Sequence, residues 1–198
     1  MGETKRKRKK PVPETVAPFL APLLALQELL SKFDDQGVII GGVAASLLGT
    51  PRFTVDVDAV LLLSIEDLPT LIFEAANQGI EPRIPDAVSF ARKNRVLLLR
   101  HTSSGIDIDI SLGSLPFEAE LVERSKIMEI GTLKLRLPAP EDLIIMKAVA
   151  HRPQDLEDIR AVAASQPVLD QERIKFWIDQ FGDALDQPEL WNEIYRLL

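Results

Sequence analysis

The chain has 198 residues, 46% of them hydrophobic and 27% charged, which suits a globular protein with one domain and helical additions. It contains no cysteine, which excludes disulfide bonds and thiolate-bound zinc and favours a reducing, cytoplasmic location. No stretch is apolar over enough residues to span a bilayer, so we expect no membrane association.

Charge is distributed unevenly along the chain. The net charge is −7, but the first ten residues hold six Lys or Arg and one Glu, so they carry +5 and the rest carries −12. A basic arm on an acidic body is typical of a disordered tail that binds polyanions, and equally of a tail that only aids solubility. We predict a disordered basic tail over residues 1–12, with both interpretations open.

The first half of the chain predicts two helices and two strands. Apolar residues recur at helical spacing over 16–30, which indicates an amphipathic helix. A short buried strand follows at 38–40, and a short helix is expected over 43–49 after a Gly-Gly turn. The stretch 55–63 alternates Asp with β-branched residues before an apolar run, which is typical of a strand.

The second half predicts a mixture of elements that ends in helices. A helix is expected over 64–79, with Ser64 as its N-cap and Asp67 in the capping-box position. The stretch 87–101 is predicted as a strand that turns near Lys93 and Asn94. The further expected elements are a strand at 105–111, a helix at 114–125, a hairpin at 126–137 around Gly131, and helices over 139–151, 155–165, 170–182 and 188–198.

This order of elements predicts an α+β fold, with a small mixed sheet flanked by helices and a helical C-terminal part. We divide the chain into the basic tail at 1–12, a core with its N-terminal helix at 13–139, and the helical C-terminal part at 140–198.

Two acid pairs stand out on predicted strands. Asp56 and Asp58 are two positions apart on a strand, so their side chains point the same way, on the order of 6–7 Å apart. Carboxylates that close repel each other unless a cation bridges them, and hard oxygen ligands suit Mg²⁺ or Mn²⁺. Asp107 and Asp109 repeat the pattern. If the two strands are neighbours, three or four carboxylates converge, and such a site can hold two metal ions.

Gly41 and Gly42 stand between a strand and a helix start, where backbone N–H groups can bind a phosphate. Taken alone, the pair is more simply a tight turn. Its combination with the Arg52-x-Thr54 loop and the two Asp-x-Asp strands is a more specific signal.

The stretch GGVAASLLGTPRFTVDVD at 41–58 resembles the signature of the DNA polymerase β-like nucleotidyltransferase superfamily. It is most similar to the minimal prokaryotic branch that includes toxins of the AbiE and MenT types. The stretch LPAPEDLIIMKAVAHRPQDLEDI at 137–159 resembles the same branch, so the resemblance covers about 38–159. It implies a nucleotidyltransferase fold and metal-dependent transfer of a nucleoside monophosphate from an NTP to an acceptor hydroxyl.

The resemblance also implies roles for individual residues. Metal binding falls to Asp56, Asp58 and Asp109. The third of these would also help deprotonate the attacking hydroxyl, and Asp107 is its rival. Lys147 would act in catalysis by contacting the triphosphate of the nucleotide or the acceptor.

Nucleotide binding is expected at Gly41 and Gly42, which would hold the triphosphate. Arg52 and Thr54 match the Arg-x-Thr element, where Arg52 offsets the acid cluster. Asp155 would complete the helical motif.

Several of these side chains, and some of their neighbours, are also compatible with simpler roles. Lys147 could simply extend to solvent, and Asp155 could be an ordinary acid at a helix start. Asp158 is expected to pair with a surface cation, and His151 shares the Lys147 face without an assigned role. A basic patch that is either solvated or guides a nucleic acid is expected at Arg92, Lys93, Arg95 and Arg100. Helical core is expected at Phe176, Trp177, Phe181, Trp191 and Tyr195.

The expected ligands are an NTP substrate and Mg²⁺ or Mn²⁺. The resemblance makes tRNA or another RNA the expected acceptor, with a toxin-like role and a cognate antitoxin or regulatory protein as partner. Two alternatives are a non-catalytic module that binds nucleotide or nucleic acid, and a nucleotidyltransferase that modifies a small molecule such as an antibiotic.

Overall fold

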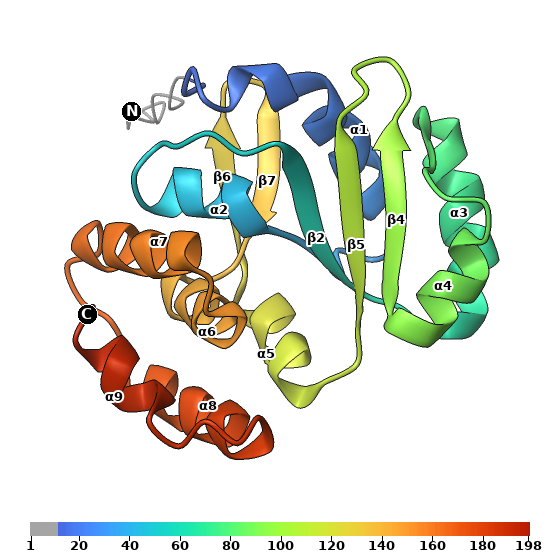
Figure 1. Ribbon diagram of the computed structural model, residues 1–198. Coiled ribbons are helices and arrows are strands. Elements are labelled where there is room, and N and C mark those ends of the chain that lie inside the picture. Colours follow the sequence, from blue (N-terminus) through green and yellow to red (C-terminus); the bar gives the residue numbers. More distant parts are fainter. Residues whose placement is uncertain (1–11) are drawn as a thin grey trace, which may run out of the picture.

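A computed structural model describes residues 12–198, so the predicted basic tail lies outside the described residues except for Val12. Its centre is a mixed sheet of five strands in the order β1-β2-β5-β4-β3 (Figure 1). Only β2 and β5 run parallel, and the other pairs are antiparallel. The strands are β1 (Gly37–Ile40), β2 (Asp56–Leu62), β3 (Ile80–Pro82), β4 (Val96–His101) and β5 (Asp107–Gly113).

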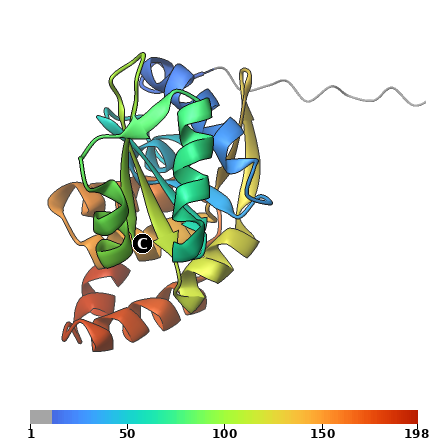
Figure 2. The same cartoon turned by 90° about the vertical axis from the view of Figure 1, so that its right-hand side faces the viewer.

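Helices cover both faces of this sheet. On one face, α1 (Leu20–Leu30) packs against β2 and α3 (Leu68–Asn77). On the other face, α2 (Gly41–Leu48) packs against β2 and against two later helices, α6 (Pro140–Ala150) and α7 (Pro153–Ala164). Figure 2 shows the same layers edge-on. The predicted α+β fold, a mixed sheet flanked by helices, is confirmed.

The remaining elements surround this centre. A separate hairpin of β6 (Lys126–Ile130) and β7 (Leu133–Leu137) packs with β7 against β1 and α1, and α8 (Gln171–Ala184) packs on α6 (Figure 1). These elements are η1 (Ala17–Phe19), η2 (Ile65–Asp67), α4 (Ala87–Asn94), α5 (Pro116–Arg124), β6 (Lys126–Ile130), β7 (Leu133–Leu137), α8 (Gln171–Ala184) and α9 (Leu190–Tyr195). Within residues 12–198 no helix is both long and apolar enough to cross a membrane.

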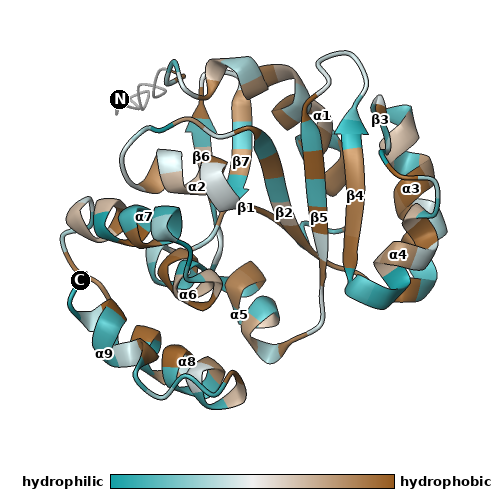
Figure 3. Cartoon of the chain, in the orientation of Figure 1, coloured by the Kyte–Doolittle hydropathy of each residue, from teal (hydrophilic) through white to brown (hydrophobic). Residues whose placement is uncertain are grey.

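The central strands show why the acid pairs can coexist with an apolar core. In β2 and β5 hydrophilic and hydrophobic residues alternate along the first half of each strand (Figure 3). Val57, Ala59, Ile108 and Ile110 are fully buried on one face, and the aspartates between them are half-buried on the other. One strand thereby serves the core with one face and a polar site with the other.

Three sequence predictions are corrected. Residues 87–94 form α4 rather than a strand, because Ala87 and Ala91 are buried one helical turn apart while Val88, Ser89 and Phe90 between them are exposed. Ser64 does not cap its helix, since its hydroxyl bonds the Glu66 side chain and the helix starts with η2.

The third correction concerns the C-terminal aromatic residues, which we expected in the core. Phe176 and Tyr195 are more than half exposed. Trp177 and Phe181, by contrast, stack edge to face on Phe117 of α5. These contacts attach α8 to the rest of the protein.

Candidate active site

Four aspartates form an array on one face of the sheet. In the parallel pairing of β2 with β5, Asp56 lies opposite Asp107 and Asp58 lies opposite Asp109. Paired residues point to the same face, as do residues two apart on one strand, and neighbouring strands lie about 4.8 Å apart. The expectation that the two Asp-x-Asp strands are neighbours is confirmed by this register.

Gly41 and Gly42 bring the start of α2 against this array. Gly41 has φ of +63°, and a Cβ built on it would lie 1.8 Å from Oδ2 of Asp58. A Cβ on Gly42 would lie 2.4 Å from Oγ1 of Thr54. Both the backbone conformation and the space therefore require glycine at position 41. The first turn of α2 carries no side-chain cap, and the free N–H groups of a helix start favour a bound anion.

The loop after α2 places Arg52 and Thr54 beside the acids. Ser46 fixes the loop, because its hydroxyl donates to the Arg52 carbonyl at 3.0 Å. Thr54 Oγ1 donates to Asp56 Oδ1 at 3.0 Å, which orients that carboxylate. Arg52 instead donates from Nε and Nη2 to the two oxygens of Asp158, at 2.5 and 2.7 Å. The direct partner of Arg52 is thus Asp158 rather than the strand acids.

The corner between α6 and α7 forms a charge network beside the array, in which Lys147, Asp155 and Asp158 are buried and Arg152 is exposed. Lys147 is only 6% exposed, and its Nζ lies 2.7 Å from Asp155 Oδ1 and 2.9 Å from Asp158 Oδ2. Arg152 donates from Nε to Asp155 Oδ2 at 2.6 Å. Lys147 therefore does not extend to solvent. Asp158 pairs with this buried lysine and with the partly buried Arg52 rather than with a surface cation, because α7 packs the acid against α6 and the Arg52 loop.

A cavity of about 420 Å³ opens between the array, the loop and this corner. A smaller one of about 160 Å³ adjoins it and shares Asp58, Lys147, Arg152 and Asp155 with it. The larger cavity is lined by Gly42, Arg52, Phe53, Thr54, Val55, Asp56, Asp58, Asp109, Lys147, Arg152, Gln154 and Asp155. The smaller cavity adds Gly41 to the predicted residues. All nine predicted site residues therefore line one continuous region.

The acids in this region differ in their electrostatics. Burial, followed by the charges of Asp56 and Asp109, raises the pKa of Asp58 from 3.8 to about 6. Burial also acts to raise the pKa of Asp155, but hydrogen bonds from Arg152 and Lys147 outweigh it and lower that pKa overall. Lys147 and Arg152 thus act on the strand acid Asp58 only through their charge, whereas both donate hydrogen bonds to the α7 acid Asp155.

Asp109, and not its rival Asp107, lines the cavity. Each of these carboxylates is held by an arginine. Both oxygens of Asp109 accept hydrogen bonds from Arg83, and Asp107 Oδ1 accepts one from Arg100 Nε at 2.7 Å. The hydrogen bond from Arg100 is the main reason that the pKa of Asp107 is lowered.

The donor set fits a divalent cation in part. Asp56 and Asp58 present hard oxygen donors to the cavity, and a bound cation would offset both the burial and the repulsion that raise the pKa of Asp58. Asp109 is engaged with Arg83, and within residues 12–198 no three His, Cys, Asp or Glu side chains are arranged to hold a metal. The residues present thus fit an ion bound by Asp56 and Asp58, while the oxygens of Asp109 are held by Arg83.

Several residues of the site carried no predicted role. Arg83 gave no signal, because it is a single arginine far from the motifs in sequence. Arg152 could have been found from its position, since it precedes Pro153 and an acid three residues into a helix. Phe53 and Val55 are 79% and 81% exposed at the cavity, and such apolar side chains beside an Arg-x-Thr element were a signal in the sequence.

The residues predicted without a firm role lie elsewhere. His151 contacts Glu193 of α9, with 3.1 Å between Nε2 and Oε2. The predicted basic patch is split, because Arg95 donates to the Leu112 carbonyl at 2.8 Å and Arg100 pairs with Asp107.

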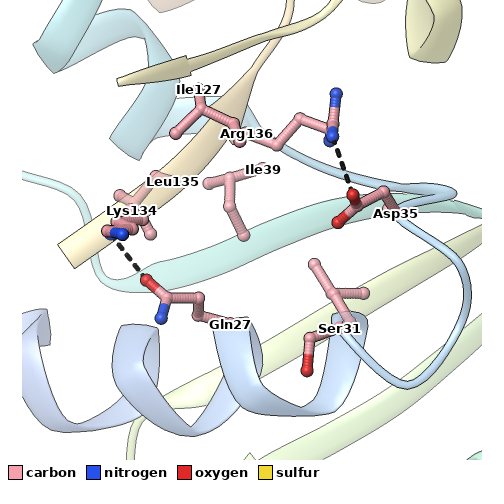
Figure 4. A pocket seen from close by; sticks show the side chains of 10 residues that line it. Gln27, Ser31, Asp35, Ile39, Ile127, Lys134, Leu135 and Arg136 are labelled. Atoms are coloured by element: carbon pink, nitrogen blue, oxygen red, sulfur yellow. Dashed lines mark hydrogen bonds and ion pairs between the residues drawn. The ribbon is translucent and has the colours of Figure 1, made fainter. Parts of the chain in front are cut away.

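A separate pocket of about 200 Å³ lies on the opposite face of the sheet (Figure 4). Ile39 at its base pairs with Ala59, so it points away from the face that carries Asp58. The polar groups around it are partnered: Gln27 Oε1 accepts from the Lys134 backbone at 2.6 Å, and Arg136 pairs with Asp35 at 3.2 Å. This pocket is therefore not part of the acid site.

The sequence matches the model of a protein family, DUF6036, described as nucleotidyltransferases of unknown function, over residues 20–184. The chain belongs to this family. No curated protein matches the DUF6036 chain.

Solved structures of nucleotidyltransferase type share its fold. An antigenic nucleotidyltransferase-like protein from Paracoccidioides brasiliensis is 14% identical, with a TM-score of 0.53 over 92% of this chain and 94% of its own. The antibiotic-resistance factor ANT(2'')-Ia is 16% identical, with a TM-score of 0.56 over 85% of this chain and 95% of its own. Family membership identifies the DUF6036 chain as a transferase of nucleotidyltransferase type, and its fold is the one that these structures have.

Proposed function

We propose that this DUF6036 protein is a metal-dependent enzyme that transfers a nucleoside monophosphate from an NTP to an acceptor hydroxyl, with release of pyrophosphate. One observation carries the proposal: the cavity lined by Asp56, Asp58 and Asp109 also meets the uncapped start of α2. Donors for a cation and donors for a phosphate therefore face the same space. A structural acid pair would not need a glycine helix start packed against it.

We assign binding of the negatively charged triphosphate to backbone N–H groups and to cationic side chains of the cavity. The N–H groups at Gly41 and Gly42 would bind phosphate oxygens. Arg152 has a side chain mostly exposed to the cavity and would reach the same oxygens. Lys147 is tied to Asp155 and Asp158, so we assign it a fixed positive charge in the cavity wall rather than a mobile contact.

The carboxylates are assigned to the cation and to the acceptor. A bound Mg²⁺ or Mn²⁺ would supply Lewis-acid stabilisation of the charge that develops on the triphosphate. Asp56, held by Thr54, and Asp58 would bind it. Asp109 would accept the proton of the acceptor hydroxyl, which requires an oxygen of this carboxylate to be free of Arg83.

The rim of the cavity provides an apolar surface for a ring. Phe53 and Val55 are largely exposed there, and the Arg52 side chain fixes the Phe53 carbonyl with a hydrogen bond of 2.8 Å. Stacking of a base or ring on an aromatic side chain contributes roughly 1–3 kcal/mol. Phe53 is therefore assigned to the binding of a ring of the nucleotide or of the acceptor.

For the acceptor we propose an RNA, in line with the resemblance to the AbiE-type and MenT-type branch, with the basic residues 5–10 as an arm toward it. This places the protein in a toxin-like role beside an antitoxin or regulatory partner. The acidic body, −12 outside the first ten residues, and the fold of ANT(2'')-Ia favour a second candidate, a cationic small molecule such as an antibiotic.

The test is a labelling experiment with each of the four α-labelled NTPs, Mg²⁺ or Mn²⁺, and either total RNA or a set of aminoglycosides. The proposal expects label on one acceptor class, lost with EDTA and lost in Asp56→Asn. Asp179→Asn, which changes a surface acid paired with Lys175 on α8, serves as the matched control and should label normally. Label on a small molecule alone would select the second candidate. If no NTP is transferred and none binds, the protein is a non-catalytic module and the proposal fails.

A further inference from the structure

Arg83 follows the end of β3 and reaches across β4 to an acid of β5. Its backbone N–H donates to the Leu98 carbonyl at 3.1 Å, which continues the β3–β4 pairing by one residue. Its guanidinium donates from Nη1 and Nη2 to the two oxygens of Asp109, the second at 3.1 Å, and from Nη1 to the Leu99 carbonyl at 3.2 Å. The side chain of Arg83 is only about 20% exposed. The pair is therefore bidentate and partly desolvated, a stronger arrangement than an exposed ion pair.

The Arg83–Asp109 pair engages the β5 carboxylate that lines the cavity together with Asp56 and Asp58. Asp56 and Asp58 lie on the neighbouring strand β2, and within the described residues neither forms an ion pair with an arginine. Both oxygens of Asp109, by contrast, accept hydrogen bonds from Arg83. A cation that needs an oxygen of Asp109 must therefore displace at least one N–H of Arg83.

A second acid lies where Arg83 could move. Asp107 Oδ2 is 3.8 Å from Arg83 Nε, and the other oxygen of Asp107 is held by Arg100. A small rotation of the guanidinium would bring Arg83 within hydrogen-bond distance of Asp107. Both acids of the second Asp-x-Asp pair would then have a role: Asp109 would face the cation in the cavity, and Asp107 would accept the displaced Arg83.

We propose that Arg83 is a positioning residue that withholds Asp109 from the cation site in the ligand-free protein and moves onto Asp107 when a cation binds. The inference rests on the proposed function, since it concerns the same site. A simple structural role, in which Arg83 only joins β3 to β5, predicts a loss of stability on mutation and no gain in cation binding. The two roles are therefore separable by experiment.

The size of the effect follows from competition between two partners for one carboxylate. Removing Arg83 raises the affinity of Asp109 for the cation by the free energy with which the two partners oppose each other. A charge-assisted bidentate pair corresponds to a change of roughly 10- to 100-fold in an equilibrium constant. We expect Mn²⁺ to bind Arg83→Ala more tightly by about that factor.

The experiment titrates Mn²⁺ into nucleotide-free protein and follows free Mn²⁺ by electron paramagnetic resonance. Arg100→Ala is the matched control, because it removes an exposed arginine from Asp107 and leaves the Arg83–Asp109 pair in place. Since it only makes Asp107 more available to Arg83, it should raise the affinity by no more than about threefold. In the double variant Arg83→Ala with Asp109→Asn, the gain should disappear. If Arg83→Ala does not fold, Arg83→Lys replaces it, since lysine cannot form the bidentate pair and should give a smaller gain of the same sign.

The move onto Asp107 has its own test. Asp107→Asn should weaken Mn²⁺ binding, because Arg83 then has no second carboxylate, and this weakening should be absent when Arg83→Ala is also present. Unchanged or weaker Mn²⁺ binding by folded Arg83→Ala, or no Mn²⁺ binding by either protein, would overturn the inference.

Failure of the proposed function is a different result: a tighter Mn²⁺ site in Arg83→Ala together with no transfer of any NTP would leave Arg83 as assigned and remove the activity.

Discussion

Asp58→Asn tests the electrostatic account of the acid cavity through folding stability alone. The pKa of Asp58 is raised from 3.8 to about 6 by burial and by Asp56 and Asp109. Between these two pH values the folded protein binds more protons than the unfolded chain, so the free energy of unfolding of the wild type falls as pH rises. At 1.36 kcal/mol per pKa unit, the full penalty above pH 6 is roughly 3 kcal/mol. The asparagine variant keeps the shape of the side chain and does not carry this penalty.

The assay is urea unfolding in EDTA at several pH values between 4 and 8. We expect the variant and the wild type to have similar stability near pH 4. By pH 8 the variant should be more stable by up to roughly 3 kcal/mol, or about 6–12 °C in melting temperature for a chain of this size. Asp107→Asn is the control: the pKa of Asp107 is lowered mainly by Arg100, so its removal should not stabilise the protein at any pH. A variant that is less stable than the wild type at pH 8, or a difference that does not depend on pH, would refute the reasoning.

Further variants test other parts of the site. Gly41→Ala should be strongly destabilised and inactive because its Cβ would meet Asp58, whereas Gly105→Ala, which has a similar positive φ and open space, should cost only the backbone strain of about 1 kcal/mol in thermal unfolding. Phe53→Ala should raise KM for one substrate several-fold at unchanged melting temperature, and unchanged KM values for both substrates would remove the stacking role. Asp158→Asn should lower the free energy of unfolding by about 3–5 kcal/mol, since it leaves Arg52 and Lys147 without a shared partner, and a smaller loss than in an exposed-acid variant would contradict this. Deleting residues 1–10 should flatten the salt dependence of RNA binding in filter assays, and an unchanged slope would leave the arm with solubility alone.

The sequence predicts the array of acids because its cause is local. Alternation along a strand places Asp56 and Asp58 on one face whatever the rest of the fold is, and the same holds for Asp107 and Asp109. The Gly-Gly turn is predicted for a related reason, since glycine at a strand end allows a backbone conformation that other residues disfavour. Each of these features depends on a few consecutive residues.

The features that were missed depend on contacts between distant parts of the chain. Arg83 matters only because β3 and β5 flank the same strand, and nothing near Arg83 in sequence indicates this. The burial of Asp158 depends on the packing of α7 against α2 and α6. The strand predicted over 87–94 was wrong for the opposite reason: its propensities are ambiguous, and burial of Ala87 and Ala91 decided for a helix.

The contact between Gly41 and Asp58 has a consequence for comparing members of the family. A Cβ at 41 would meet not only the carboxylate of Asp58 but also its Cβ, at 2.8 Å. A relative that has lost the acid would therefore still need glycine at 41, because any side chain at 58 keeps a Cβ in that place and the backbone at 41 keeps its positive φ. Glycine at 41 is thus expected in family members with and without the acid. The residue at 58 is the one that would separate members able to hold a cation from those that are not.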